Sequence, residues 1–442
     1  MAKRRLKALS LMTMREASQT SDTSSPRTLT DLPVELIWHI ASYLTTPTLI
    51  CDFDFVTVRE REFDLCALRL VCRSLHDKVQ DVFLPAAFHT LDVDLTRSHL
   101  DALIEISENS KYAATVRELH FVMAEAWPDH PDDWSEDFEQ ERMERNHLER
   151  GTGAILLSRA LKGFSALTTV RIKPVMWFPG NSRFTLARWP HGEGSTTSLM
   201  ATILAALGLS DSRITTLSCS RVITSKHELN GPTGCHISQF DMPASSRKAF
   251  QHLQTLDLII AVRPSKLFDP DMATAFTTFL LSLKQLVSLS IRFDCEPLSE
   301  LVTCDFLSIG HMKNLTRFRL EMAWINDTII DCPLILFIQH NKQIQHFHLA
   351  FVDLHGGQWP ELFETLRTEC EDLRSVEVWC PGEGASGVLF KGQKFLRIRE
   401  SDDIQARLTE AQHEISVMNQ PHDGNSFARY ERYRDDSEYD PD

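Results

Sequence analysis

The sequence predicts an α/β protein, in which a small all-helical segment precedes a long repetitive region built on a curved parallel sheet. Three observations predict this fold. A capped amphipathic helix is expected over residues 32–44, and a phrase of the form apolar-x-x-apolar-x-apolar recurs eight times between residues 116 and 378. Helix-like stretches precede most copies of the phrase. Strands that alternate with helices favour parallel pairing.

Composition is that of an ordinary globular protein. The 442 residues are 43% hydrophobic and 24% charged. No apolar run reaches the roughly 18 residues that span a bilayer, so we expect no membrane partner. The basic start, residues 1–7, lacks the apolar core of a secretory signal, and the ten cysteines contain no C-x-x-C pair. We therefore expect reduced thiols, a cytoplasmic or nuclear protein, and a disordered leader over residues 1–28.

The formal net charge of −15 is concentrated in two segments. Residues 124–150 hold ten acidic residues against three arginines, and residues 400–442 hold twelve against four. A nucleic-acid-binding protein needs a basic face, so we expect no nucleic-acid partner. We interpret residues 124–150 as an acidic insertion, with a docking site for a basic partner as the alternative. Residues 400–442 are expected to be a largely disordered acidic tail, with a short helix over 403–418.

The first expected helix combines start signals with an apolar stripe. Asp31 is a suitable N-cap, and Pro33 falls in the first turn, where a missing N–H costs nothing. Glu35 complements the helix dipole. The stripe consists of Leu36, Ile40 and Leu44, with Ile37 and Tyr43 beside it.

Two segments together resemble an F-box, the module that binds the Skp adaptor of SCF-type ubiquitin ligases. The first runs Leu29-Thr30-Asp31-Leu32-Pro33-Val34-Glu35-Leu36 and continues to Leu44; the second runs Asp64-Leu65-Cys66-Ala67-Leu68-Arg69-Leu70-Val71-Cys72-Arg73-Ser74-Leu75. The resemblance covers residues 29–80. It departs from the family's pattern at one point, because 20 residues separate Leu44 from Leu65 where F-boxes have a handful. We expect an inserted loop at about residues 45–63.

The resemblance implies that the chain binds the Skp adaptor and, through it, cullin. The partner would cover apolar side chains that so small a helical core cannot bury by itself. The implied contact residues are Leu32, Pro33, Glu35, Leu36, Ile40, Leu44, Leu65, Leu68, Val71 and Leu75.

The repetitive region is expected over residues 81–399. Its phrases begin at Val116, Leu167, Ile214, Leu253, Leu286, Leu315, Ile344 and Leu373, and residues 88–93 are a candidate degenerate copy. The last four starts are 29 residues apart, whereas the earlier steps are longer and indicate insertions. A strand and a helix in 29 residues resemble an irregular leucine-rich repeat, which buries its strands by stacking into a solenoid. No consistent Asn follows the strands, so a generic α/β domain is the alternative.

If the apolar positions of each phrase point into the core, the residues between them line the exposed, concave face of the sheet. The row is Arg171, Ser218, Asp257, Ser290, Arg319, His348 and Glu377, flanked by Lys173, Ile259, Arg292, Glu321 and Trp379. Mixed charge beside an exposed aromatic residue is typical of a protein-binding surface, so this face is the candidate site for a target protein. Ordinary solvated strand residues are the alternative.

Catalytic motifs are absent from the sequence. It contains no P-loop, dinucleotide-binding fingerprint, nucleophile elbow or zinc-protease motif. His346 and His348 share a strand face but lack the partner spacing of a zinc site. We expect no metal, no cofactor and no catalytic residue. The favoured function is a non-catalytic substrate-recognition subunit; the alternatives are an interaction scaffold outside a ligase, and an enzyme with an unrecognised site.

Overall fold

The computed structural model divides into two compact units, residues 1–91 with 114–116, and residues 92–113 with 117–442. The parts of the chain that it describes are residues 32–45, 67–68, 70–93, 95, 97–122, 151–173, 195–219, 235, 237–260, 270–293, 306–325, 332–354, 358–383, 386–399 and 403–418. The predicted leader, the loop at 45–63 beyond Thr45, the acidic insertion and residues 419–442 lie outside these ranges.

The first unit, hereafter the helical unit, contains two described helices that pack on each other, α2 (Val34–Thr45) and α4 (Arg73–Phe88). The indole Nε1 of Trp38 donates to the carbonyl of Lys78 at 2.6 Å, and Lys78 Nζ donates to the carbonyl of Leu32 at 3.1 Å. These bonds tie each helix to the other's backbone. The side chains buried in this unit are Ile37, Ala41, Leu75, Val79, Phe83 and Leu84.

The buried side of α2 differs from the predicted stripe. Ile37 and Ala41 are buried, whereas Leu36 is 50% exposed and Ile40 is half-buried. The reason is that α4 covers only a narrow strip of the α2 surface, centred one residue further round the helix than the predicted stripe. Helix α2 begins directly after Pro33, whose carbonyl accepts the N–H groups of Leu36 and Ile37.

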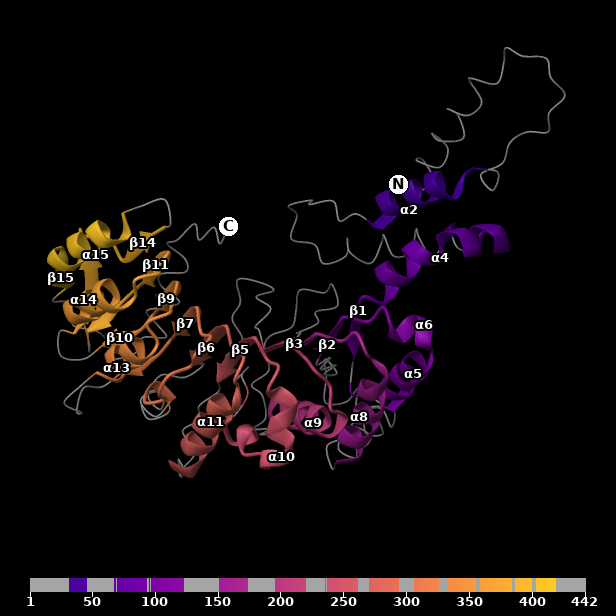
Figure 1. The fold of residues 1–442 in the computed structure, drawn as a ribbon, viewed down its shortest axis with the longest axis horizontal. Helices are drawn as coiled ribbons and strands as arrows, with labels where there is room; N and C mark the ends of the chain where they lie inside the picture. Colours follow the sequence, from indigo (N-terminus) through magenta and orange to yellow (C-terminus); the bar gives the residue numbers. More distant parts are fainter. Residues whose placement is uncertain are drawn as a thin grey trace, which may run out of the picture. The chain divides into compact units, whose positions relative to one another are not determined.

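The second unit, hereafter the sheet unit, is built on a ten-stranded sheet (Figure 1). Its strands follow their order in the chain, and neighbouring strands are parallel from β2 to β11, while β11 and β14 are antiparallel. They are β1 (Thr90–Val93), β2 (Glu118–Val122), β3 (Thr169–Lys173), β4 (Thr216–Cys219), β5 (Thr255–Ile260), β6 (Ser288–Phe293), β7 (Arg317–Glu321), β9 (His346–Ala350), β11 (Ser375–Trp379) and β14 (Phe395–Ile398).

The eight sequence phrases occupy matching positions in this sheet. The central apolar residue of each phrase pairs with that of the next, and all eight are at most 2% exposed. They are Leu119, Val170, Leu217, Leu256, Leu289, Phe318, Phe347 and Val376. The prediction of an α/β fold with a mostly parallel sheet is confirmed.

The sheet unit is built of repeats, and one backbone carbonyl in a repeat holds the strand of the next repeat in place. The carbonyl of Arg117 accepts the N–H groups of Thr168 and Thr169, at 2.9 and 3.0 Å. The same double acceptance, always by the N–H groups that begin the next strand, recurs along the sheet at the carbonyls of Thr168, Thr215, Gln254, Val287, Thr316 and Gln345. This carbonyl ladder needs no particular side chain, which explains why the sequence shows no consistent Asn.

Segments of the C-terminal repeats form a second sheet of five strands. In its order, β15-β13-β12-β10-β8, it comprises β15 (Ile415–Met418), β13 (Ser386–Phe390), β12 (Gly382–Glu383), β10 (Asp353–Leu354) and β8 (Trp324–Ile325). Met322, Phe351 and Cys380 link the main sheet to it, and they have φ angles of 54°, 55° and 45°. Left-handed backbone at three non-glycine residues spaced 29 positions apart shows that the last units repeat in conformation as well as in sequence.

The helices of the sheet unit follow the predicted pattern. Figure 1 shows α5, α8, α9 and α11 on one side of the sheet. The helices are α5 (Arg97–Glu108), α6 (Ser110–Ala113), α8 (Gly153–Gly163), α9 (Ser195–Ser210), α10 (Ala244–Arg247), α11 (Pro270–Ser282), α13 (Pro333–His340), α14 (Trp359–Glu369) and α15 (Ile404–His413), with short 3₁₀ turns η4 (Ile237–Phe240) and η5 (Lys248–Phe250). In the described part of the chain, no helix is both long enough and apolar enough to cross a membrane.

Two predicted boundaries need correction. The boundary at residue 80 falls inside α4, which continues to Phe88 because Phe83 and Leu84 are still buried. The boundary at 399 is also too early: α15 packs on α14, and β15 pairs with β13. Residues 404–413 are helical as predicted, but Ile415–Met418 is a strand, because the edge of β13 offers it hydrogen bonds that a sequence pattern does not reveal.

Asn341, which is 0% exposed, joins two consecutive repeats of the sheet unit. Its Oδ1 accepts the N–H of Met312 at 2.7 Å, and its Nδ2 donates to the carbonyl of Phe337 at 2.8 Å. We predict that Asn341→Ala lowers the free energy of unfolding by about 1–3 kcal/mol, because it leaves buried backbone groups without partners. Urea denaturation measures this.

Asn314→Ala is the matched control. The Asn314 amide is exposed and donates one bond, to the carbonyl of Lys284 at 3.0 Å, so we expect a loss below about 1 kcal/mol. Equal losses in the two variants would contradict the importance of the buried amide.

Candidate binding surfaces

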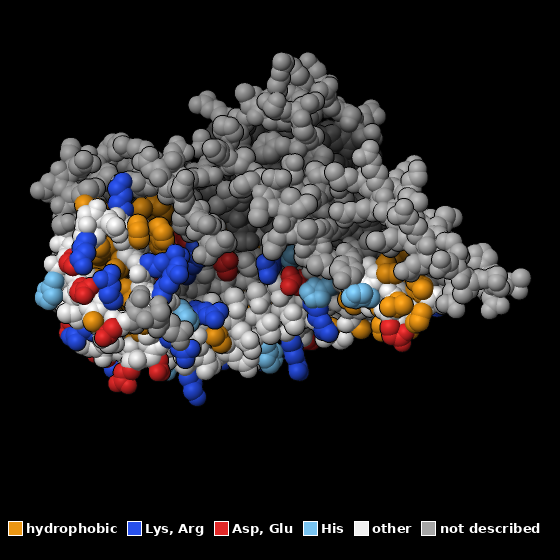
Figure 2. Space-filling model, turned by 90° about the horizontal axis from the view of Figure 1, so that it is seen from above, with side chains coloured by type: hydrophobic (Ala, Val, Ile, Leu, Met, Phe, Trp, Pro, Cys, Tyr) orange, Lys and Arg blue, Asp and Glu red, His pale blue; other side chains and the backbone are white. Residues whose placement is uncertain are grey.

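The face of the ten-stranded sheet opposite the buried phrase residues carries three rows of side chains, hereafter the open face. On β7 the pattern is plain: Arg317 and Arg319 are exposed and Glu321 is half-buried, while Phe318 and Leu320 between them are buried. Parallel register places the equivalent residues of neighbouring strands side by side. Figure 2 shows basic and acidic side chains intermingled on the described surface. The open face therefore carries mixed charge, as the sequence predicts.

A hollow of about 590 Å³ lies on the open face, lined by residues of β5, β6, β7, β9 and β11. Small side chains on β6, Ser288 and Ser290, separate Asp257 on β5 from the arginines on β7. The hollow therefore results from side-chain size along one strand of a continuous sheet.

A network of alternating charge lies along one side of the hollow. Glu321 contacts two guanidinium groups and an imidazole: it pairs with Arg319, lies 3.9 Å from Arg292 and lies 3.7 Å from Nε2 of His348. The other nitrogen of that imidazole, Nδ1, is 3.2 Å from Glu377, which is also 2.7 Å from Nε of Arg397. The imidazole thus lies between two carboxylates, each of which also contacts arginine.

The network alters the acidity of Glu377. Its hydrogen bond with His348, together with that from Arg397, lowers the pKa of Glu377 from 4.5 to about 2, although partial burial acts in the opposite direction. The carboxylate is therefore ionised at neutral pH and is a poor proton donor. This chemistry suits a fixed electrostatic surface better than acid–base catalysis.

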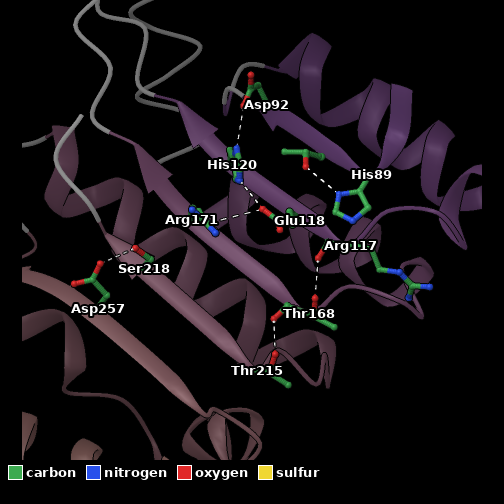
Figure 3. Close-up of polar contacts among 11 residues, drawn as sticks. His89, Asp92, Arg117, Glu118, His120, Thr168, Arg171, Thr215, Ser218 and Asp257 are labelled. Carbon is green, nitrogen blue, oxygen red and sulfur yellow. Dashed lines mark hydrogen bonds and ion pairs between the residues drawn. The ribbon is translucent and has the colours of Figure 1, made fainter. Parts of the chain in front are cut away.

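A second polar cluster lies at the other end of the open face (Figure 3). His120 on β2 lies 3.0 Å from Glu118 and 3.4 Å from Asp92 on β1. Arg171 on β3 approaches Glu118 at 3.8 Å. Farther along the sheet, Ser218 donates to Asp257 at 3.2 Å. Charged side chains therefore gather in two clusters, one on β1 to β3 and one around the hollow, and Ser218 on β4 lies between them.

Of the nine charged and aromatic residues of the predicted face, the structure brings six together and separates the other three. Around the hollow lie Asp257, Arg292, Arg319, Glu321, His348 and Glu377. Arg171 belongs to the second cluster, and Trp379 stacks on Phe395 with a centroid distance of 5.1 Å beneath Arg397. Lys173 is in register with Val122, but its side chain is outside the described set.

Two polar residues of these clusters escaped the prediction for different reasons. His120 lies between the last two apolar positions of the first phrase, in register with Arg171, so the alternation rule that selects Arg171 also selects it. Arg397 had no such signal, because it lies on β14, which pairs antiparallel with β11 and places Arg397 opposite Glu377. Only the paired strands show that these two residues meet.

The predicted adaptor contacts of the helical unit fall into three classes. Leu75 is buried in the unit's own core, whereas Leu32, Ile40 and Leu68 are half-buried. The exposed contacts are Pro33, Glu35, Leu36 and Val71. Leu65 and the side chain of Leu44 are outside the described set.

Metal ligation has no candidate in the described ranges, where no group of three or more His, Cys, Asp and Glu residues could hold an ion. The cysteines in these ranges are free thiols. Burial raises the pKa of the Cys370 thiol to about 12, so this thiol is unreactive at neutral pH.

No protein-family model matches this sequence, and no curated protein is significantly similar to it.

The depressed pKa of Glu377 predicts a pH-dependent stability. Its ionised form stabilises the fold fully above about pH 4.5, and this contribution is lost as the pH falls toward about 2. We expect Glu377→Gln to lower the melting temperature most at pH 7, and the difference from wild type to shrink between pH 4.5 and pH 3. Thermal denaturation across this range measures it.

Glu371→Gln, at an exposed carboxylate, is the control and should show no comparable trend. A difference between Glu377→Gln and wild type that is constant from pH 7 to pH 3 would refute the role assigned to the network.

Proposed function

We propose that this protein is a non-catalytic substrate-recognition subunit of an SCF-type ubiquitin ligase. The helical unit binds the Skp adaptor as an F-box, and the sheet unit, a leucine-rich-repeat-like solenoid, binds a target protein on its open face. The observation that carries the proposal is the two-part F-box pattern, whose first part leads into α2 and whose second part ends at the start of α4, with the exposed Leu70 and Val71 just before that helix.

The exposed apolar residues support an adaptor site on the helical unit. Leu36 is 50% exposed, Leu70 is 82% exposed and Val71 is 67% exposed, and Trp38 is partly exposed as well. These are four of the eight large apolar side chains that are most exposed in the described part of the chain. Apolar surface gathered on so small a unit is typical of a site that a partner covers.

The stacking of the sheet unit supports the solenoid. Consecutive phrases form consecutive strands, and each strand start binds the carbonyl of the unit before it. A sheet assembled in this way presents side chains from many units on one continuous face, which suits recognition of an extended protein segment. The mixed charge of the open face provides the specificity.

The proposed mechanism is proximity. The receptor holds a target close to a ubiquitin-conjugating enzyme on cullin, which raises the effective concentration of the target's lysines. The receptor makes and breaks no bond itself.

A hydrolase is the second candidate, and one observation favours it. In the hollow, Nδ1 of His346 lies 2.9 Å from Oγ of Ser375, a distance compatible with a nucleophile and its base. Against a hydrolase stands the neighbouring network, in which the carboxylates are already engaged by arginine.

The adaptor site is tested with Leu36→Ala/Val71→Ala. Both side chains are exposed, so the fold should be retained, while loss of two partner-covered apolar groups should weaken Skp binding at least about tenfold. Isothermal titration with purified Skp adaptor measures the affinity. Ile155→Ala/Leu209→Ala removes equally exposed apolar groups from the sheet unit and should bind as wild type.

Unchanged binding by Leu36→Ala/Val71→Ala would refute the F-box assignment. Co-purification of cullin with the wild type separates a ligase subunit from a scaffold: a scaffold would retain Skp without cullin. Target proteins found by proximity labelling should stay with the adaptor-site variant and accumulate in cells that express it.

The hydrolase is tested with a fluorophosphonate probe. A hydrolase would react in the wild type and fail to react in Ser375→Ala. We expect no difference between the two proteins, because a recognition surface does not activate its hydroxyl groups.

A further inference from the structure

One row of the hollow contains hydrogen-bond donors and no carboxylate. The first residues of five neighbouring strands lie side by side in register, and all of them line the hollow. These five residues, called the donor row from here on, are Thr255, Ser288, Arg317, His346 and Ser375. Three hydroxyl groups, a guanidinium and an imidazole form a surface that favours a negatively charged ligand.

The carboxylates of the hollow come from the other two rows, and each has a partner of its own. Glu321 is bound by Arg319 and approached by Arg292, and Glu377 is bound by Arg397. Asp257 accepts from Ser218. The arginines balance the charges of Glu321 and Glu377, whereas the hydroxyl of Ser218 leaves the charge of Asp257 in place. The donor row is therefore the part of the hollow that carries a cation and no carboxylate.

Arg317 is the centre of the donor row. It is exposed, and no ion pair joins it to another residue in the described ranges. Ser288 lies on one side of it and His346 on the other, in register. The hydrogen bond between His346 and Ser375, at 2.9 Å, holds those two side chains in place. A guanidinium flanked by hydroxyl and imidazole groups is suited to the oxygens of a phosphate or a carboxylate.

We propose that the donor row binds an anionic group, a phosphate or a carboxylate, carried by an extended segment of the target protein. The inference rests on the proposed function for its biological setting, because the target is what brings the anion to the open face. Five strands spaced by about 4.8 Å give the row a length of roughly 19 Å, which accommodates about six extended residues. The hollow admits the anionic side chain of one of them.

The site is tested on the full-length protein with three probes: inorganic phosphate, N-acetyl-phosphoserine amide and N-acetyl-glutamate amide. Each is titrated at constant ionic strength, and affinity is obtained from the rise in melting temperature, since a ligand that binds the folded state stabilises it. A stronger response to both phosphate probes identifies a phosphorylated target segment; a stronger response to the glutamate probe identifies an acidic one.

Two variants are expected to change the affinity for the anion in opposite directions, and a control variant is expected to leave it unchanged. Arg317→Gln should weaken binding at least fivefold, because it removes the cation at the centre of the donor row. Asp257→Asn should strengthen binding two- to fivefold, because it removes a carboxylate that lines the same hollow. Arg213→Gln, at an exposed arginine outside the hollow, should leave the affinity unchanged.

Absence of any response in the wild type, or equal affinity in wild type and Arg317→Gln, would overturn the anion site. Arg317→Gln should bind Skp adaptor as the wild type does, since the adaptor contacts lie in the helical unit. Failure of adaptor binding in the wild type would therefore refute the ligase role and leave the anion measurement standing.

Discussion

The carbonyl ladder is the constraint on which the sheet unit depends. At the starts of the seven main-sheet strands from β3 to β11, one peptide carbonyl of the preceding repeat accepts two N–H groups, so each of these strands is placed by the one before it. Because the donors and acceptors are backbone atoms, units of different length and sequence can join the same sheet. Insertions between the early units therefore lengthen the connections without shifting the register of the buried apolar residues.

Fixed register decides what the open face can present. It places Glu321 beside His348, places His348 beside Glu377, and aligns Ser288 with Arg317. The charged pairs are partly buried and hold each other in place, while the small hydroxyl side chains of β6 leave the hollow open. The same sheet thus combines a border of mutually paired charges with a row of hydrogen-bond donors.

The helical unit is governed by a different constraint, which is the incomplete burial of its apolar side chains. Two packed helices enclose only part of the apolar surface of this unit: Ile37 on α2 and Leu75 on α4 are buried, while Leu36 on α2 and Val71, which precedes α4, remain exposed. Such a unit gains stability when a partner covers the remainder. The helical unit and the sheet unit each have a buried core of their own, and the proposed function assigns one binding surface to each of them.

The sequence by itself determined the repeat, the helix positions and most of the open face. Apolar spacing is set by the alternation of a strand, so Leu289, Phe318 and Phe347 could be assigned to the core without coordinates. Tertiary structure alone decided which side of α2 is buried, that Ile415–Met418 is a strand, and that Arg397 reaches Glu377. These three features depend on packing and antiparallel pairing between segments that are distant in the chain. The residue pattern within one segment does not indicate which other segment it packs against.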